Sequence, residues 1–122
     1  MRRVTTKSVS RLIDAYLKGH QDLTVRQRAV SHFHAGIAHV YYGDIPGGVL
    51  DLNQALVPEK TAGLSDDWND MVIAHRAFVT QNRGELLAAK ERMDKLPASA
   101  GEWAGCADEL LQHFGERYGS WR

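Results

Sequence analysis

The feature that most constrains the fold is an 18-residue stretch, from Val25 to Tyr42, that reads as a single helix. When its residues are placed at 3.6 per turn, apolar side chains lie on nearly every side. The main apolar stripe consists of Val30, Phe33, Ile37, Val40 and Tyr41. A helix that is apolar almost all round lies buried within a globular domain. We therefore expect this helix, about 27 Å long at 1.5 Å per residue, to be the one around which the others pack.

The remaining segments have the apolar periodicity of amphipathic helices, and no segment alternates for long enough to predict a strand. A length of 122 residues is typical of one domain. We predict a single all-α domain over 1–122, with about six antiparallel helices. Its parts are an N-terminal helix over 5–18, helix pairs over 25–56 and 66–96, and a C-terminal capping helix over 100–118.

Residues with helix-capping character mark the ends of the central helix. Thr24 and Gln27 have the spacing of a capping box, in which each side chain binds the other residue's backbone N–H. Gly43 and Asp44 end this helix and cap the next one, and Pro46 suits the first turn that follows. These signals predict a helical hairpin with a very short turn.

Small residues recur at regular positions around this turn, and weaker copies follow later in the chain. The first copy consists of Ala35-Gly36, His39, Gly43-Asp44, Gly48, Leu52 and Ala55. A second copy consists of Ile73, Arg76-Ala77, Thr80, Gly84-Glu85, Ala89, Met93 and Leu96, and a half copy of Trp103, Cys106-Ala107 and Leu110. This spacing resembles the tetratricopeptide repeat. The departures include His32 and His39 in aromatic positions and Arg76 in an apolar one.

The resemblance implies a right-handed array of helix pairs, and an irregular helical bundle is the alternative. Such arrays are mostly adaptors that bind a protein or peptide in a groove lined by the first helix of each pair. The positions that line the groove in the family are occupied here by Phe33, Ile37, Val40, Tyr41, Met71 and Phe78. We therefore expect a non-enzymatic interaction or assembly module, with a protein, a peptide or a second copy of the chain in this apolar groove.

The N-terminal helix offers another occupant for the same groove. Its apolar face consists of Val9, Leu12, Ile13, Tyr16 and Leu17. If this face fills the groove, the groove residues are intramolecular packing residues and no partner site exists there. The sequence leaves both interpretations open.

The histidines and the single cysteine do not form a recognisable catalytic or metal motif. His32 and His39 are seven residues apart, whereas zinc-binding pairs on one helix are usually three to five apart. We interpret both as packing residues with a hydrogen-bond partner, and we expect no metal, no cofactor and no enzymatic activity. Cys106 lies on an apolar helix face, where a thiol is typically buried and inert. The carboxylates Asp66, Asp67 and Asp70 are explained by helix capping, or alternatively by a cation or a basic partner.

The charge and hydropathy of the chain limit the remaining function classes. The formal net charge is zero, although seven Lys or Arg against two Asp through Arg28 leave the N-terminal part at +5. Nucleic-acid binding through this basic end is a weaker hypothesis, because no aromatic residues for stacking are interleaved with it. No apolar run reaches the length of about 20 residues that spans a membrane, and no signal peptide is recognisable, so we expect a cytoplasmic protein.

The main alternative function is a helical domain with an internal pocket for a small ligand. It predicts that His39, Tyr41 and His75 converge on one cavity.

Overall fold

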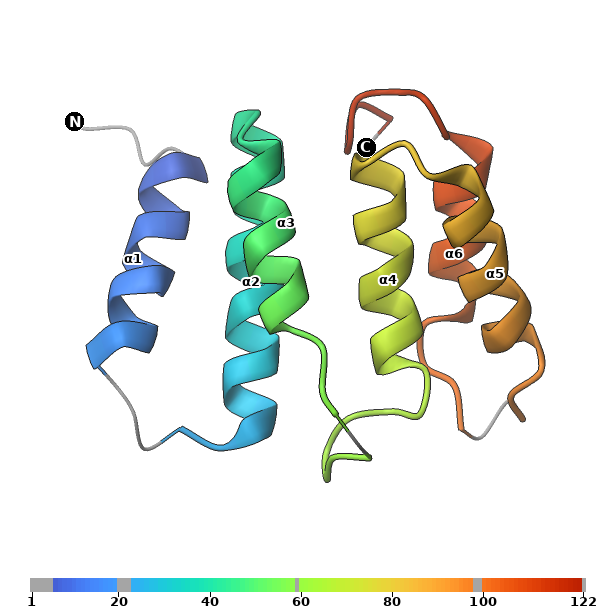
Figure 1. Ribbon diagram of the computed structural model, residues 1–122, viewed down its shortest axis with the longest axis horizontal. Helices are drawn as coiled ribbons and strands as arrows, with labels where there is room; N and C mark the ends of the chain where they lie inside the picture. Colours follow the sequence, from blue (N-terminus) through green and yellow to red (C-terminus); the bar gives the residue numbers. More distant parts are fainter. Residues whose placement is uncertain (1–5, 20–22, 59, 98–99, 122) are drawn as a thin grey trace. The chain divides into compact units, whose positions relative to one another are not determined.

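The computed structural model describes residues 6–19, 23–58, 60–97 and 100–121, and all its regular secondary structure in these segments is helical. The all-α prediction is therefore confirmed for the described residues. The helices are α1 (Thr6–Gly19), α2 (Val25–Tyr42), α3 (Ile45–Gln54), α4 (Trp68–Val79), α5 (Arg83–Asp94) and α6 (Ala104–Gln112) (Figure 1).

The helices divide into two compact units, Met1–Val57 and Pro58–Arg122. In the first unit α2 contacts both α1 and α3, as expected for its central helix. In the second unit α4, α5 and α6 all contact one another. The prediction of one continuous array over 1–122 stays a prediction.

The ends of α2 and the start of α3 follow the capping signals of the sequence. Thr24 and Gln27 form both hydrogen bonds of the predicted capping box. Gly43 ends α2 with a φ of 98°, a left-handed conformation that glycine adopts without strain. Asp44 then accepts a hydrogen bond from the backbone N–H of Gly47, and α3 begins at once. The turn of the predicted hairpin is therefore confirmed.

Two glycines allow α2 and α3 to approach closely. A Cβ atom on Gly36 would lie 3.1 Å from the carbonyl oxygen of Gly48, and one on Gly48 would lie 2.6 Å from Cγ2 of Val40. The helices thus meet at nearly backbone-to-backbone distance. This close approach is the reason for the small residues that the repeat-like spacing singled out.

Small residues, rather than the large apolar stripe, make up most of the buried positions of α2. Of the five residues in the predicted stripe, only Val40 is buried, and the other four are half-buried. The buried set is Ala29, Ala35, Gly36, Ala38 and Val40. The neighbouring helices therefore pack against the backbone of α2 more closely than a leucine-rich interface would permit.

Aromatic rings close the core of the second unit around Phe78, which is only 1% exposed. Its ring centroid lies 6.1 Å from that of Phe114, 5.8 Å from that of Tyr118 and 5.4 Å from that of Trp121. The indole of Trp121 also stacks on the imidazole of His113 at 4.5 Å. The last residues of the described chain thus complete this core.

The C-terminal helix differs from the predicted 100–118. It begins four residues later and ends six residues earlier, because α6 covers Ala104–Gln112. Beyond it, Gly115 has a φ of 92°, which stops the helix and starts a series of turns. The other predicted boundaries agree within two residues where the structure describes them, and residue 5 lies outside the described part.

A buried carboxylate connects the start of α4 to the segment that precedes α6. Asp67 is 1% exposed, and its Oδ1 accepts a hydrogen bond from Ser65 Oγ at 2.6 Å. Its Oδ2 accepts hydrogen bonds from the backbone N–H groups of Glu102 and Trp103, at 3.0 and 2.8 Å. Asp67 occupies the N-cap position of α4, but its side chain makes no cap hydrogen bond to that helix. It holds a distant backbone segment instead.

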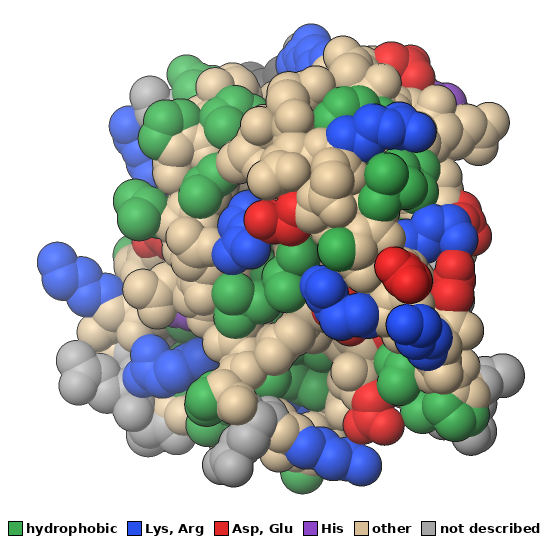
Figure 2. All heavy atoms as spheres, turned by 45° about the vertical axis from the view of Figure 1, so that its right-hand side comes forward, with side chains coloured by type: hydrophobic (Ala, Val, Ile, Leu, Met, Phe, Trp, Pro, Cys, Tyr) green, Lys and Arg blue, Asp and Glu red, His purple; other side chains and the backbone are tan. Residues whose placement is uncertain are grey.

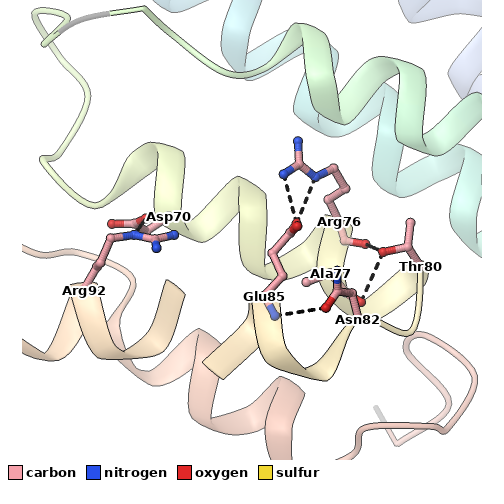
Figure 3. Close-up of polar contacts among 7 residues, drawn as sticks. All are labelled: Asp70, Arg76, Ala77, Thr80, Asn82, Glu85 and Arg92. Atoms are coloured by element: carbon pink, nitrogen blue, oxygen red, sulfur yellow. Dashed lines mark hydrogen bonds and ion pairs between the residues drawn. The ribbon is translucent and has the colours of Figure 1, made fainter. Parts of the chain in front are cut away.

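Polar contacts organise the turn between α4 and α5 (Figure 3). Arg76, which departs from the apolar residue of the repeat pattern, donates to Glu85 Oε1 from Nε at 3.2 Å and from Nη2 at 2.9 Å. Asn82 Oδ1 accepts the backbone N–H of Glu85 and caps α5, and Thr80 Oγ1 donates to the carbonyl of Arg76. The Arg76–Glu85 ion pair therefore takes the place of the apolar contact that the repeat-like spacing predicts at this position.

None of the helices in the described segments combines the length and the hydropathy that a bilayer-spanning segment needs. On the face shown in Figure 2, Lys and Arg side chains lie among Asp and Glu, with apolar side chains between them. That face therefore presents a mixed surface, with both signs of charge close together.

We expect Gly48→Ala to lower the free energy of unfolding by about 1–3 kcal/mol, because the added methyl group overpacks the contact with Val40 and Gly36. Gly84→Ala is the control, since among the described residues its Cβ would meet Asn82 Oδ1 alone, at 3.8 Å. The control should be neutral or stabilise by up to about 1 kcal/mol through helix propensity. Denaturant unfolding followed by circular dichroism measures both variants. Equal stability of Gly48→Ala and the unsubstituted protein would show that the close approach is not needed.

We expect Asp67→Ala to lower the free energy of unfolding by about 2–3 kcal/mol, because three part-buried donors lose a charged acceptor. The adjacent Asp66→Ala is the control, since Asp66 pairs at 3.5 Å with Lys60, whose side chain is largely exposed. The control should change stability by less than about 0.5 kcal/mol. The same denaturant titration compares the two variants, and similar losses for both would contradict the role assigned to Asp67.

Candidate functional site

The densest group of ionisable side chains in the described chain lies in the first unit, on all three of its helices. We call it the His39 cluster, and it consists of Asp14 of α1, His32 and His39 of α2, Asp44 at the start of α3, and Asp51 of α3. Seven residues are almost two helical turns, so His32 and His39 project from the same side of α2. The close approach of α2 and α3 then places Asp51 between them.

His39 faces three carboxylates at once. Its Nε2 lies 3.3 Å from Oδ2 of Asp14 and 3.3 Å from Oδ2 of Asp51. Its other nitrogen, Nδ1, lies 3.2 Å from Oδ2 of Asp44. The imidazole is therefore held on both sides, and its orientation is determined by its neighbours.

His32 holds the second oxygen of the same central carboxylate. Its Nδ1 lies 2.9 Å from Oδ1 of Asp51, within normal hydrogen-bond distance. Asp51 therefore bridges the two imidazoles, with one oxygen toward each. This arrangement leaves Asp51 little freedom to rotate.

The electrostatics of the cluster are dominated by the burial of Asp51, which is 8% exposed. Burial raises the pKa of the Asp51 carboxyl, since the charged form loses hydration. The hydrogen bond with His32 opposes this shift, and the negative charge of Asp14 adds to it. With both histidines neutral, the cluster carries three negative charges in a partly desolvated space, and it therefore favours a cation or a proton.

A pocket of about 500 Å³ opens beside the cluster in the first unit. Its walls include two cluster members, Asp14 and His32. The other lining residues are Leu17, Lys18, Arg28 and Gln54. The volume is within the range of small-molecule sites, and solvent or a ligand can reach the edge of the cluster through it.

The structure places the predicted groove residues in different environments. Phe33, Ile37 and Tyr41 are half-buried, whereas Val40 is buried. Met71 and Phe78 belong to the second unit, and both are buried in the structure. Only the three half-buried side chains offer surface to a partner without rearrangement, and the groove itself stays a prediction.

The N-terminal helix packs on α2 with only part of its apolar face. Leu17 is buried and Ile13 is half-buried, but Leu12 is 67% exposed and Tyr16 is 47% exposed. The side chain of Val9 lies outside those described. The predicted face is therefore split between an inner edge that packs and an outer edge that faces solvent.

The residues named by the small-ligand hypothesis are divided between the two units, and their convergence on one cavity stays a prediction. His39 and Tyr41 belong to the first unit, whereas His75 is buried among residues of the second. His75 Nδ1 donates to the carbonyl of Met71 at 2.9 Å, and its Nε2 lies 3.7 Å from Sγ of Cys106. Cys106 is partly exposed, rather than buried as its apolar helix face suggested.

Sequence reasoning missed the His39 cluster because it considered the histidines on one helix only. The relevant partners come from α1 and α3, so the spacing rule for two ligands on one helix does not apply. The register of the helical hairpin could have predicted this contact. When the turn lies at Gly43 and Gly36 faces Gly48, Asp51 of α3 lies opposite residues near Phe33 of α2. That register brings Asp51 within reach of His32. The expectation of no metal therefore rested on an incomplete set of ligands.

Comparisons of the chain with protein-family models, with curated proteins and with solved structures found no match.

Proposed function

We propose that the chain is a non-enzymatic, cytoplasmic interaction module, in which the exposed side of α1 binds a helix of a partner protein. The observation that carries this proposal is a row of exposed apolar and small residues on α1. They are Leu12, Ala15, Tyr16 and Gly19, which we call the α1 stripe. Their spacing of i, i+3, i+4 and i+7 is the pattern by which one helix packs on another.

The α1 stripe has the shape of a helix-docking surface. Two large side chains alternate with two small positions, so a partner helix can lie between them. A Cβ atom on Gly19 would meet no atom of the described residues within 4 Å. Leu12 and Tyr16 would supply most of the binding free energy, since buried apolar and aromatic side chains dominate such interfaces.

Charge indicates which partner suits the stripe. Arg11 and Lys18 are exposed and seven residues apart, so they border the stripe along one edge. We therefore infer a partner helix with an apolar face and acidic residues along its matching edge. A second copy of the chain fits less well, because a two-fold antiparallel pairing of α1 helices brings the two basic edges to the same side.

Two further features support an interaction role. The close approach of Gly36 and Gly48 is the kind of contact that the resemblance to tetratricopeptide repeats implies, which favours an adaptor. The single cysteine, which forms no disulfide, suits a reducing compartment.

A second candidate function is the binding of a small anionic ligand in the pocket beside the His39 cluster. Lys18 and Arg28 line that pocket together with Asp14 and His32, and the two basic side chains would attract a negative group. Arg28→Glu should weaken such a ligand and leave binding at the α1 stripe unchanged, which separates the two candidates.

We expect a photo-crosslinking residue at position 15 to form one discrete adduct with a partner protein in the cells that make the chain. The same residue at position 50 is the control, since Leu50 is exposed as fully as Leu12 but lies on α3. Leu12→Ala together with Tyr16→Ala should remove the adduct, and should weaken binding of the purified partner at least about tenfold. Arg11→Glu with Lys18→Glu should also weaken it, more so at low salt.

Three outcomes would count against this proposal. If positions 15 and 50 gave equal amounts of adduct, the partner would have no preference for the α1 stripe. An adduct with the mass of two chains would identify self-association. An adduct that survives the Leu12 and Tyr16 changes but is lost on Phe33→Asp would assign binding to the predicted groove.

A further inference from the structure

The geometry points to a binding site for a divalent transition-metal ion of the zinc type, formed by Asp14, His39 and Asp51. Each residue offers one donor atom, and the three atoms lie within 4.8 Å of one another. His39 Nε2 lies 3.3 Å from both carboxylate oxygens. Zinc bonds of about 2.0–2.1 Å in a tetrahedron place neighbouring ligand atoms about 3.3–3.4 Å apart. Two of the three spacings therefore match a shared ion.

A hydrogen bond accounts for the contact of His39 Nε2 with Oδ2 of Asp14, but not for its equally short contact with Oδ2 of Asp51. Nε2 carries at most one hydrogen, which cannot point well at two carboxylate oxygens that lie at equal distances. Both distances also exceed the 2.7–2.9 Å or so that is usual for charged N–H···O⁻ bonds. If the proton is on Nδ1 and is donated to Asp44, a lone pair on Nε2 faces two negative oxygens. A cation among these three atoms turns that repulsion into coordination.

The neighbouring side chains orient the donors as they do in established metal sites. Nδ1 of His39 lies 3.2 Å from Oδ2 of Asp44, so a ring with its proton on Nδ1 would present the Nε2 lone pair to a metal beside a carboxylate, as in carboxylate–histidine–metal sites. His32 holds Oδ1 of Asp51 at 2.9 Å, so the opposite oxygen, Oδ2, is directed to His39. Both outer contacts therefore favour the same position for an ion.

The type of ion follows from the donor atoms. One imidazole with two carboxylates suits zinc and similar first-row divalent ions, whereas magnesium and calcium prefer oxygen donors alone. The cluster has an excess of negative charge, which a divalent ion would offset. One of the three donor residues, Asp14, also lines the neighbouring pocket.

An ion at this position would connect all three helices of the first unit. Asp14 belongs to α1, His39 to α2 and Asp51 to α3, so coordination would hold α1 against the hairpin. Asp14 is not a member of the α1 stripe, so the metal site and the proposed partner surface can be tested separately.

The test is titration of the full, tag-free chain with Zn²⁺ by calorimetry and with Co²⁺ by visible absorption. We expect one ion per chain, with a dissociation constant of about 10 µM or lower. If the Co²⁺ spectrum lacks the charge-transfer absorption of a thiolate ligand, Cys106 is excluded as a ligand. Asp14→Asn and His39→Gln should each weaken binding at least about tenfold, and Zn²⁺ should raise the melting temperature of the unsubstituted chain but not of these variants.

His34→Gln is the matched control, because His34 is exposed on the same helix and lies outside the cluster. It should bind both ions as the unsubstituted chain does. Circular dichroism checks that every variant keeps its helices. The absence of a stoichiometric site, or equal affinities for Asp14→Asn and His34→Gln, would overturn the proposal.

Discussion

The contact between Gly36 and Gly48 is the constraint on which the first unit depends. Because neither residue has a side chain, α2 and α3 pack at a separation at which even an added methyl group would be crowded. This separation places Asp51 within reach of both histidines of α2. Two glycines without side chains thus allow the His39 cluster to form.

The two units solve the problem of a buried carboxylate in different ways. Asp67 is fully satisfied by one hydroxyl and two backbone N–H groups, which are fixed donors that do not change with conditions. Asp51 relies on imidazoles, which can gain or lose a proton and can bind metals. Asp67 is therefore explained by structure alone, whereas the surroundings of Asp51 allow a chemical role.

Local signals predicted most of the helices, and they failed where contacts distant in sequence determine the backbone. The capping box at Thr24, the turn at Gly43 and the cap at Asp44 all act within four residues, and the structure has each of them. The start of α6 was missed because Asp67, far earlier in the chain, binds Glu102 and Trp103 before the helix can begin. The His39 cluster was missed for the same reason, since its members come from three helices.

The distribution of tryptophan makes the two units separately observable. Trp68, Trp103 and Trp121 all lie in the second unit, and Trp68 and Trp103 are in edge-to-face contact there. Intrinsic fluorescence excited at the indole band therefore reports the second unit alone, whereas the amide signal of the backbone reports both. A difference between the two unfolding curves measures directly how far the units fold as independent bodies.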